Sequence, residues 1–126
     1  MESNASALIV ARPGHRRDNL RALLRAVPQL KNINQVDDGP SALRIIIDGK
    51  QPSLVLLDST LPDSEVQLIL EQTQTRPSRP RSLVLVDMTR SQPPLTIGRA
   101  DEVLSADFSI TTFLAVAQRL LTRLDN

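Results

Sequence analysis

The chain alternates short apolar runs with segments that carry a helical period. The clearest runs lie at residues 7–10, 54–57 and 83–86, and each is rich in Leu or β-branched residues. Such runs are typical of strands that are buried on both faces of a parallel sheet. Weaker patterns of the same kind occur at 33–36 and 102–105. The sequence therefore predicts five strands.

The segments between these runs have the hydrophobic spacing of amphipathic helices. The first stripe falls at positions i, i+3, i+4 and i+7 and consists of Leu20, Leu23, Leu24 and Val27. The second helix is bounded by Pro40 near its first position and Gly49 just past its end. The predicted helices cover residues 19–27, 40–48, 64–74 and 110–124.

One further helix, the fourth in chain order, is interrupted. It would lie at 89–100, where Pro93 and Pro94 fit only a first turn and Gly98 favours termination. We predict a short or irregular element there. A strand followed by a helix, repeated about five times with right-handed crossovers, gives an α/β fold: a five-stranded, doubly wound parallel sheet flanked by helices.

Composition narrows the class of protein. The chain has 126 residues, 40% of them hydrophobic, which suits a single domain over residues 1–126. The net charge of +1 and the absence of Tyr and Trp give no support for a nucleic-acid or membrane partner. The chain has no cysteine, no signal-peptide layout and no apolar run near the roughly 20 residues of a membrane span. We expect a soluble, cytoplasmic protein.

Candidate chemistry lies where the predicted strands end. In an open α/β sheet, ligands bind at the carboxyl ends of the strands, near the point where the strand order reverses. The residues at these ends are Ala11, Arg12, Asp58, Asp87 and Ala106. Two carboxylates and a guanidinium are therefore expected to converge at one edge of the sheet.

At these positions the sequence resembles the receiver domain of bacterial two-component response regulators. The stretch "PSLVLLDSTLPD" is the most specific piece, and the likeness extends over about residues 7–124 through "ALIV", "DDGPSALRI" and "GRADEVLS". The resemblance implies a flavodoxin-like fold that accepts a phosphoryl group from a histidine kinase. Asp58 matches the phospho-acceptor aspartate.

The other functional positions of the family differ in this chain. The acidic pair that holds Mg²⁺ is replaced by Ala11 and Arg12, the Thr or Ser after the fourth strand by Asp87, and the Lys after the fifth by Ala106. Thr60 stands where a backbone carbonyl would complete the metal site. No metal is expected, and Asp58 with Thr60 would be the ligands if one bound.

We interpret Arg12 as a built-in counter-ion. A guanidinium can bind two carboxylates, so Arg12 is predicted to bridge Asp58 and Asp87 and to hold the domain in one state without phosphorylation. In the alternative interpretation, Arg12 is exposed and Asp58 caps a turn.

A second candidate site is a basic stripe. Arg17, Arg21 and Arg25 recur every four residues on the first helix. The stripe is a solvated helix face or, alternatively, a docking face for an acidic partner or a phosphate backbone. The only histidine, His15, is expected to be a surface residue.

The combined prediction is an atypical receiver domain, not an enzyme, that acts by protein-protein interaction with phosphorylation at Asp58 lost or impaired. Its partners would be a histidine kinase, a downstream output protein or a second copy in a homodimer. The alternative is a receiver that is phosphorylated on Asp58 with Mg²⁺ as its cofactor; otherwise no cofactor is expected. A third, weaker hypothesis is a small-molecule or nucleic-acid binding module on the same scaffold.

Overall fold

A computed structural model describes residues 5–48, 52–75, 80–87 and 100–122. Its strands are β1 (Ala5–Val10), β2 (Leu30–Val36), β3 (Leu54–Leu57), β4 (Arg81–Val86) and β5 (Glu102–Ser105). Its helices are α1 (His15–Arg25), α2 (Gly39–Ile47), α3 (Asp63–Gln74) and α4 (Ile110–Thr122). The strands form one five-stranded sheet in the order β2-β1-β3-β4-β5, and all paired strands are parallel. The predicted fold class is confirmed.

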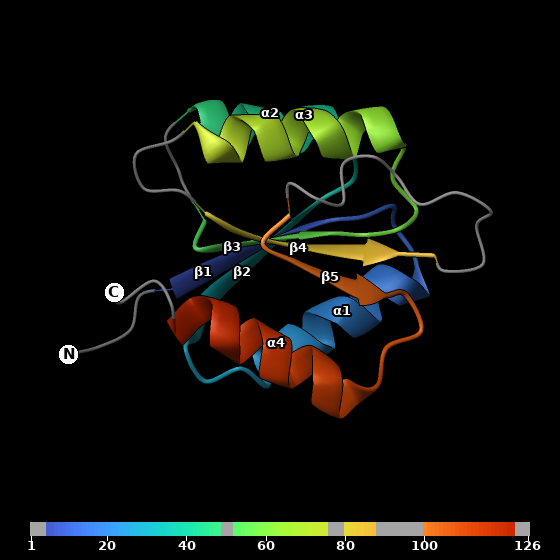
Figure 1. Cartoon of the computed structure of the whole chain (residues 1–126), viewed down its shortest axis with the longest axis vertical. Coiled ribbons are helices and arrows are strands. Elements are labelled where there is room, and N and C mark those ends of the chain that lie inside the picture. Colours follow the sequence, from blue (N-terminus) through green and yellow to red (C-terminus); the bar gives the residue numbers. More distant parts are fainter. Residues whose placement is uncertain (1–4, 49–51, 76–79, 88–99, 123–126) are drawn as a thin grey trace.

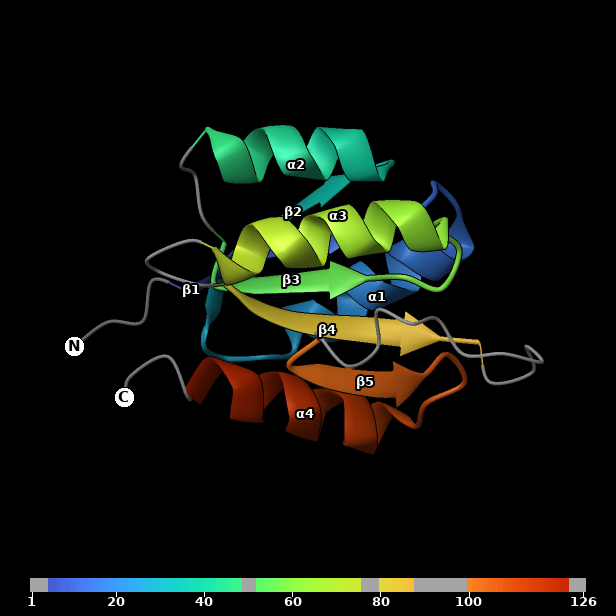
Figure 2. The ribbon, with the colours of Figure 1, turned by 45° about the horizontal axis from the view of Figure 1, so that its top comes forward.

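Helices cover both faces of the sheet. In Figure 1, α2 and α3 lie on one face and α1 and α4 on the other. Figure 2 shows the strands in sequence from β2 beside α2 to β5 beside α4. Coverage on both sides explains why the strands in the middle of the sheet are continuous apolar runs with no polar alternation.

The alternation of side chains along each strand divides the core in two. In β3, Leu54 and Leu56 pack with the α1 and α4 side, whereas Val55 and Leu57 pack with the α2 and α3 side. All of these side chains are fully buried, as is Phe113 of α4. The period-two geometry of the strand thus distributes one apolar run between two helical layers.

Most element bounds agree with the sequence prediction to within two residues, and two differ by more. Helix α1 begins at His15, four residues before the predicted start at Asn19, and β2 begins at Leu30 rather than Ile33. The interrupted helix predicted at 89–100 falls almost wholly outside the described residues, as does Leu124. Among the described helices, none is long and apolar enough to cross a membrane.

Candidate functional site

Asp58 lies at the carboxyl end of β3, next to the point where the strand order reverses between β1 and β3. Its backbone N–H donates to the carbonyl of Val10 (3.1 Å), and its own carbonyl accepts from the N–H of Leu61 (3.2 Å). The side chain is only 1% exposed. A carboxylate this deeply buried must be hydrogen-bonded to be tolerated.

Both oxygens of the Asp58 carboxylate have a partner. Arg16 donates through Nε to Oδ1 at 2.6 Å, and the hydroxyl of Thr60 donates to Oδ2 at 2.9 Å. The short distance from the guanidinium nitrogen is that of a charge-assisted hydrogen bond. The negative charge at the end of β3 is thus balanced within the fold.

Arg16 also contacts the end of β5. Its Nη2 donates to the carbonyl of Ala106 at 3.3 Å. One side chain from the first turn of α1 therefore joins segments that follow two different strands, β3 and β5.

The turn before α1 determines where Arg16 lies. Gly14 is the N-cap of α1 and has φ 149°, a conformation that side-chain-bearing residues rarely adopt. Its carbonyl accepts the first helical hydrogen bond, from Asp18 at 3.1 Å. This glycine lets the chain turn sharply after β1, so that the first turn of α1 passes beside Asp58.

The predicted bridge through Arg12 is wrong, because the residue that binds Asp58 is Arg16. Arg12 is exposed and precedes the Gly14 turn, whereas Arg16 is on the helix that returns toward the sheet edge. The second contact of Arg16 is the Ala106 carbonyl rather than the Asp87 carboxylate. Asp58 therefore has a guanidinium counter-ion, which comes from Arg16 and not from Arg12.

Some of the other predicted site residues contact Asp58 or Arg16, and others do not. Ala11 is fully buried, and its N–H donates to the carbonyl of Val36 (3.2 Å). The hydroxyl of Thr60 donates to Asp58, and the role of its backbone carbonyl as a metal ligand stays a prediction. Ala106 offers its carbonyl to Arg16, and Asp87 lies exposed just after β4.

The basic stripe of α1 is not uniformly solvated. Arg17 forms an ion pair with Asp37 and also donates to the carbonyl of Ala11, and its side chain is only 13% exposed. Arg21 is half-buried, while Arg25 is exposed. The exposed part of the predicted docking face is thus centred on Arg25. His15 is exposed, as expected.

The start of α2 carries a second polar contact between elements. Asp38 caps α2 by accepting from the N–H of Ser41 (2.9 Å), and Glu65 of α3 accepts from the N–H of Gly39 (2.7 Å). The hydrogen bonds from Ser41, followed by the positive charges of Arg12 and Arg44, lower the pKa of the Asp38 carboxyl below its ordinary value of 3.8. Neither Asp38 nor Glu65 gathers with other ligands: no metal-binding cluster occurs among the residues that the structure describes.

No protein-family model and no curated protein matches this sequence. Solved structures do match. A CheY-like response regulator receiver domain protein from Methanospirillum hungatei is 18% identical, with a TM-score of 0.77 over 98% of each chain. A CheY-like receiver domain from Methylobacillus flagellatus is also 18% identical, with a TM-score of 0.74 over 94% of this chain and 99% of the other.

This chain has the receiver fold. A third similar structure is the receiver domain of a sensor histidine kinase from Pseudomonas aeruginosa, which carries a magnesium ion in its active-site cleft; it is 18% identical, with a TM-score of 0.74 over 94% of this chain and 98% of that one. At these identities the likeness concerns the fold, so the chemistry has to be argued from the residues of this chain.

Proposed function

We propose that this chain is an atypical receiver domain in signal transduction, not an enzyme, that acts through protein-protein contact while phosphorylation of Asp58 is lost or impaired. The observation that supports this proposal is the ion pair between the buried Asp58 carboxylate and the partly exposed Arg16. Phosphoryl transfer requires a carboxylate oxygen that can attack in line and cations that neutralise the transferred group. Here each oxygen of Asp58 already accepts a hydrogen bond.

The residues around Asp58 do not fit a magnesium ion. Mg²⁺ demands a near-octahedral set of oxygen ligands. The chain offers the methyl group of Ala11 and the exposed guanidinium of Arg12 where the receiver family has its acidic pair, and Arg16 already balances the charge of Asp58. A divalent cation would have to displace Arg16 and would gain few ligands in return.

Arg16 would hold the domain in one arrangement. Its contacts join the start of α1, the end of β3 and the end of β5. Hydrogen bonds to charged groups contribute about 1.5–3 kcal/mol each, so breaking the two hydrogen bonds of Arg16 would lower the stability of this arrangement. The domain would then present a constant surface to a protein partner, either a histidine kinase, an output protein or a second copy.

One observation favours the alternative function, in which Asp58 is phosphorylated. The Arg16 guanidinium and the Thr60 hydroxyl are donors within hydrogen-bond distance of Asp58, and donors of this kind also stabilise phosphoryl oxygens. In that case Arg16 would do part of the work of a metal ion.

Treatment with a small phosphodonor separates the two functions. The protein is incubated with acetyl phosphate, or with beryllofluoride, in the presence of Mg²⁺, and its intact mass and backbone amide NMR spectrum are recorded. We expect no added phosphoryl mass and no shift of the Asp58 or Ala106 amides, as in the matched Asp58→Asn control. Stoichiometric modification that is lost in Asp58→Asn would overturn the proposal in favour of the alternative.

A further inference from the structure

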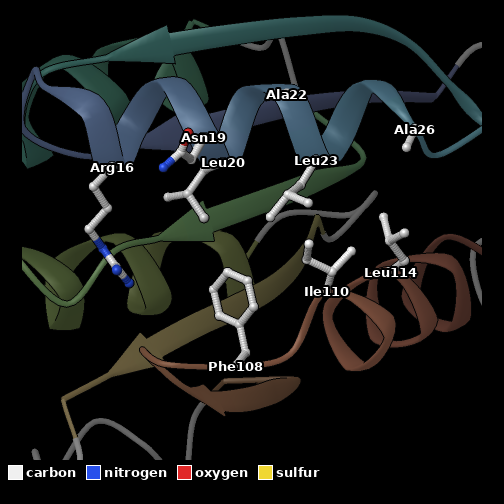
Figure 3. Close-up of a pocket in the computed structure, with 9 residues that line it drawn as sticks. All are labelled: Arg16, Asn19, Leu20, Ala22, Leu23, Ala26, Phe108, Ile110 and Leu114. Carbon is white, nitrogen blue, oxygen red and sulfur yellow. The ribbon is translucent and has the colours of Figure 1, made fainter.

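A groove lies between α1 and the segment that leads into α4. It has a volume of about 610 Å³, within the roughly 300–1,000 Å³ range of ligand-binding pockets. The nine residues drawn along it in Figure 3 are Arg16, Asn19, Leu20, Ala22, Leu23, Ala26, Phe108, Ile110 and Leu114. All but Arg16 and Asn19 are apolar, and none of the described residues that line the groove is acidic.

The groove is polar at one end and apolar at the other. In Figure 3, Arg16 and Asn19 lie toward the start of α1, whereas Leu23, Ala26 and Leu114 lie farther along. This polarity suits a ligand that has an anionic head and an apolar tail. Many binding sites combine an apolar lining with a few polar groups that fix the orientation of the ligand.

Arg16 retains donors for such a head group. A guanidinium has five N–H donors, and the contacts of Arg16 use Nε on Asp58 and one N–H of Nη2 on Ala106. The remaining donors are the two N–H groups of Nη1 and the second N–H of Nη2, which can donate to a carboxylate. The side chain is 37% exposed, so these donors are accessible.

The apolar wall of the groove is held in place by the core and is exposed to solvent at its rim. Phe108 stacks on the buried ring of Phe113 with the ring centroids 4.8 Å apart, which fixes one wall. Ile110 is 61% exposed at the rim. A ligand tail would remove this apolar surface from water without a rearrangement of the core.

We propose that this groove binds an amphiphilic monocarboxylate of the fatty-acid class, with its carboxylate on Arg16 and its chain along Leu20, Leu23 and Leu114. A docked helix or a second copy is less well matched, because Arg16 is the single charged group among the described residues that line the groove. The ligand carboxylate and Asp58 would share one cation. Binding would therefore be coupled energetically to the Asp58–Arg16 pair.

This inference uses the geometry of Arg16 and not the phosphorylation state of Asp58. Failure of the ligand test would leave the phosphodonor result untouched, and phosphorylation of Asp58 would leave the groove in place. The two proposals can therefore fail separately.

The test is titration of the whole chain with decanoate, decanol and decylamine below their micelle concentrations, followed by calorimetry and amide NMR. Charge-assisted hydrogen bonds predict that decanoate binds about 10- to 100-fold more tightly than decanol, with shifts at Leu20, Leu23 and Phe108. Asp58→Asn should tighten decanoate binding, because it removes the competing negative charge. Equal affinity for the three probes, or no saturable binding of decanoate, would overturn the proposal.

Surface variants provide the matched control. Ile110→Glu places a carboxylate on the exposed rim, where folding should be unaffected, and is expected to weaken decanoate binding about tenfold or more. Leu68→Glu makes the same change on α3 at a side chain of similar exposure (49%), and should leave binding unchanged. Concentration-dependent dimerisation that Ile110→Glu abolishes would show that the groove holds a second copy, and would contradict a small-molecule site.

Discussion

The two helix pairs that cover the faces of the sheet (Figure 1) differ in how closely they pack. On one face, Glu65 of α3 accepts from the N–H of Gly39, and a Cβ atom placed on Gly39 would lie 2.6 Å from the Cβ of Glu65. On the other face, Arg16 of α1 reaches Ala106 before α4, and an open groove remains beside it. At Gly39 the packing of α2 on α3 leaves no space for another group, whereas a groove stays open between α1 and the start of α4.

The difference indicates where the fold can respond to a ligand or partner. Glu65 accepts a hydrogen bond from the N–H of Gly39, which has no partner within α2, and the close packing at Gly39 leaves no room for a ligand. The role of this contact is therefore structural. The Arg16 contact carries a charge pair that other charged groups can compete for. If the comparison holds, changes at Arg16 should act through electrostatics and changes at Gly39 through crowding.

Loss of the guanidinium is expected to have the largest effect. Arg16→Met leaves the buried Asp58 carboxylate without its cation, and should lower the free energy of unfolding by about 3 kcal/mol, the low end for a broken buried pair because Arg16 is itself partly exposed. Urea denaturation at pH 7 measures this. Asp58→Asn in the Arg16→Met background should recover most of the loss, since a neutral amide needs no counter-ion.

The matched control for Arg16→Met is Arg25→Met, an exposed arginine on the same helix. It should change stability by less than about 0.5 kcal/mol, as surface substitutions usually do. Equal losses in the two variants would show that the Arg16 contact contributes nothing specific.

Crowding at α2 should have the next largest effect. Gly39→Ala forces a methyl group against Glu65, and overpacking of this kind costs about 1–3 kcal/mol. Gly14→Ala is the contrasting variant: its Cβ would meet nothing within 4 Å, so only the backbone at φ +149° is strained, at about 1–3 kcal/mol. Chemical denaturation should show a loss of stability in both variants, from crowding in Gly39→Ala and from backbone strain in Gly14→Ala. A neutral Gly39→Ala would contradict the close packing of α2 on α3.

The sequence predicted the sheet well because its central strands are buried on both faces. Strand β3 was predicted at its observed bounds, 54–57, since a run of four buried residues has no exposed position to blur the pattern. Helix α1 was predicted to start too late, because His15, Arg16 and Arg17 add polar residues ahead of the apolar stripe. The counter-ion was predicted at Arg12 because Arg12 directly follows β1, whereas Arg16 comes beside Asp58 only through the turn at Gly14.

The groove could not be predicted from the same pattern. Leu20 and Leu23 belong to one helical stripe and both line the groove, yet Leu20 is buried whereas Leu23 is only partly buried. Hydrophobic periodicity identifies the inward face of a helix but does not show whether a neighbouring helix covers all of it. The register of α1 against α4 is a tertiary property. The Gly14 turn, which precedes the helix, was the local signal that could have placed Arg16 correctly.

The smallest expected effect concerns the pH dependence of the α2 cap. The pKa of Asp38 is lowered in the folded protein, mainly by hydrogen bonds from Ser41. The ionised carboxylate therefore stabilises the fold at pH values above its ordinary pKa of 3.8. This contribution is lost as the pH falls through the lower pKa of the folded protein. Asp38→Asn keeps a side-chain oxygen for the cap but has no charge to lose. The urea midpoint of the natural protein should therefore exceed that of Asp38→Asn slightly at pH 7, and the difference should disappear below the folded pKa. A difference that is constant between pH 7 and the acid limit would mean that the charge of Asp38 does not contribute to the cap, and that the α2–α3 contact depends on Glu65 and close packing alone.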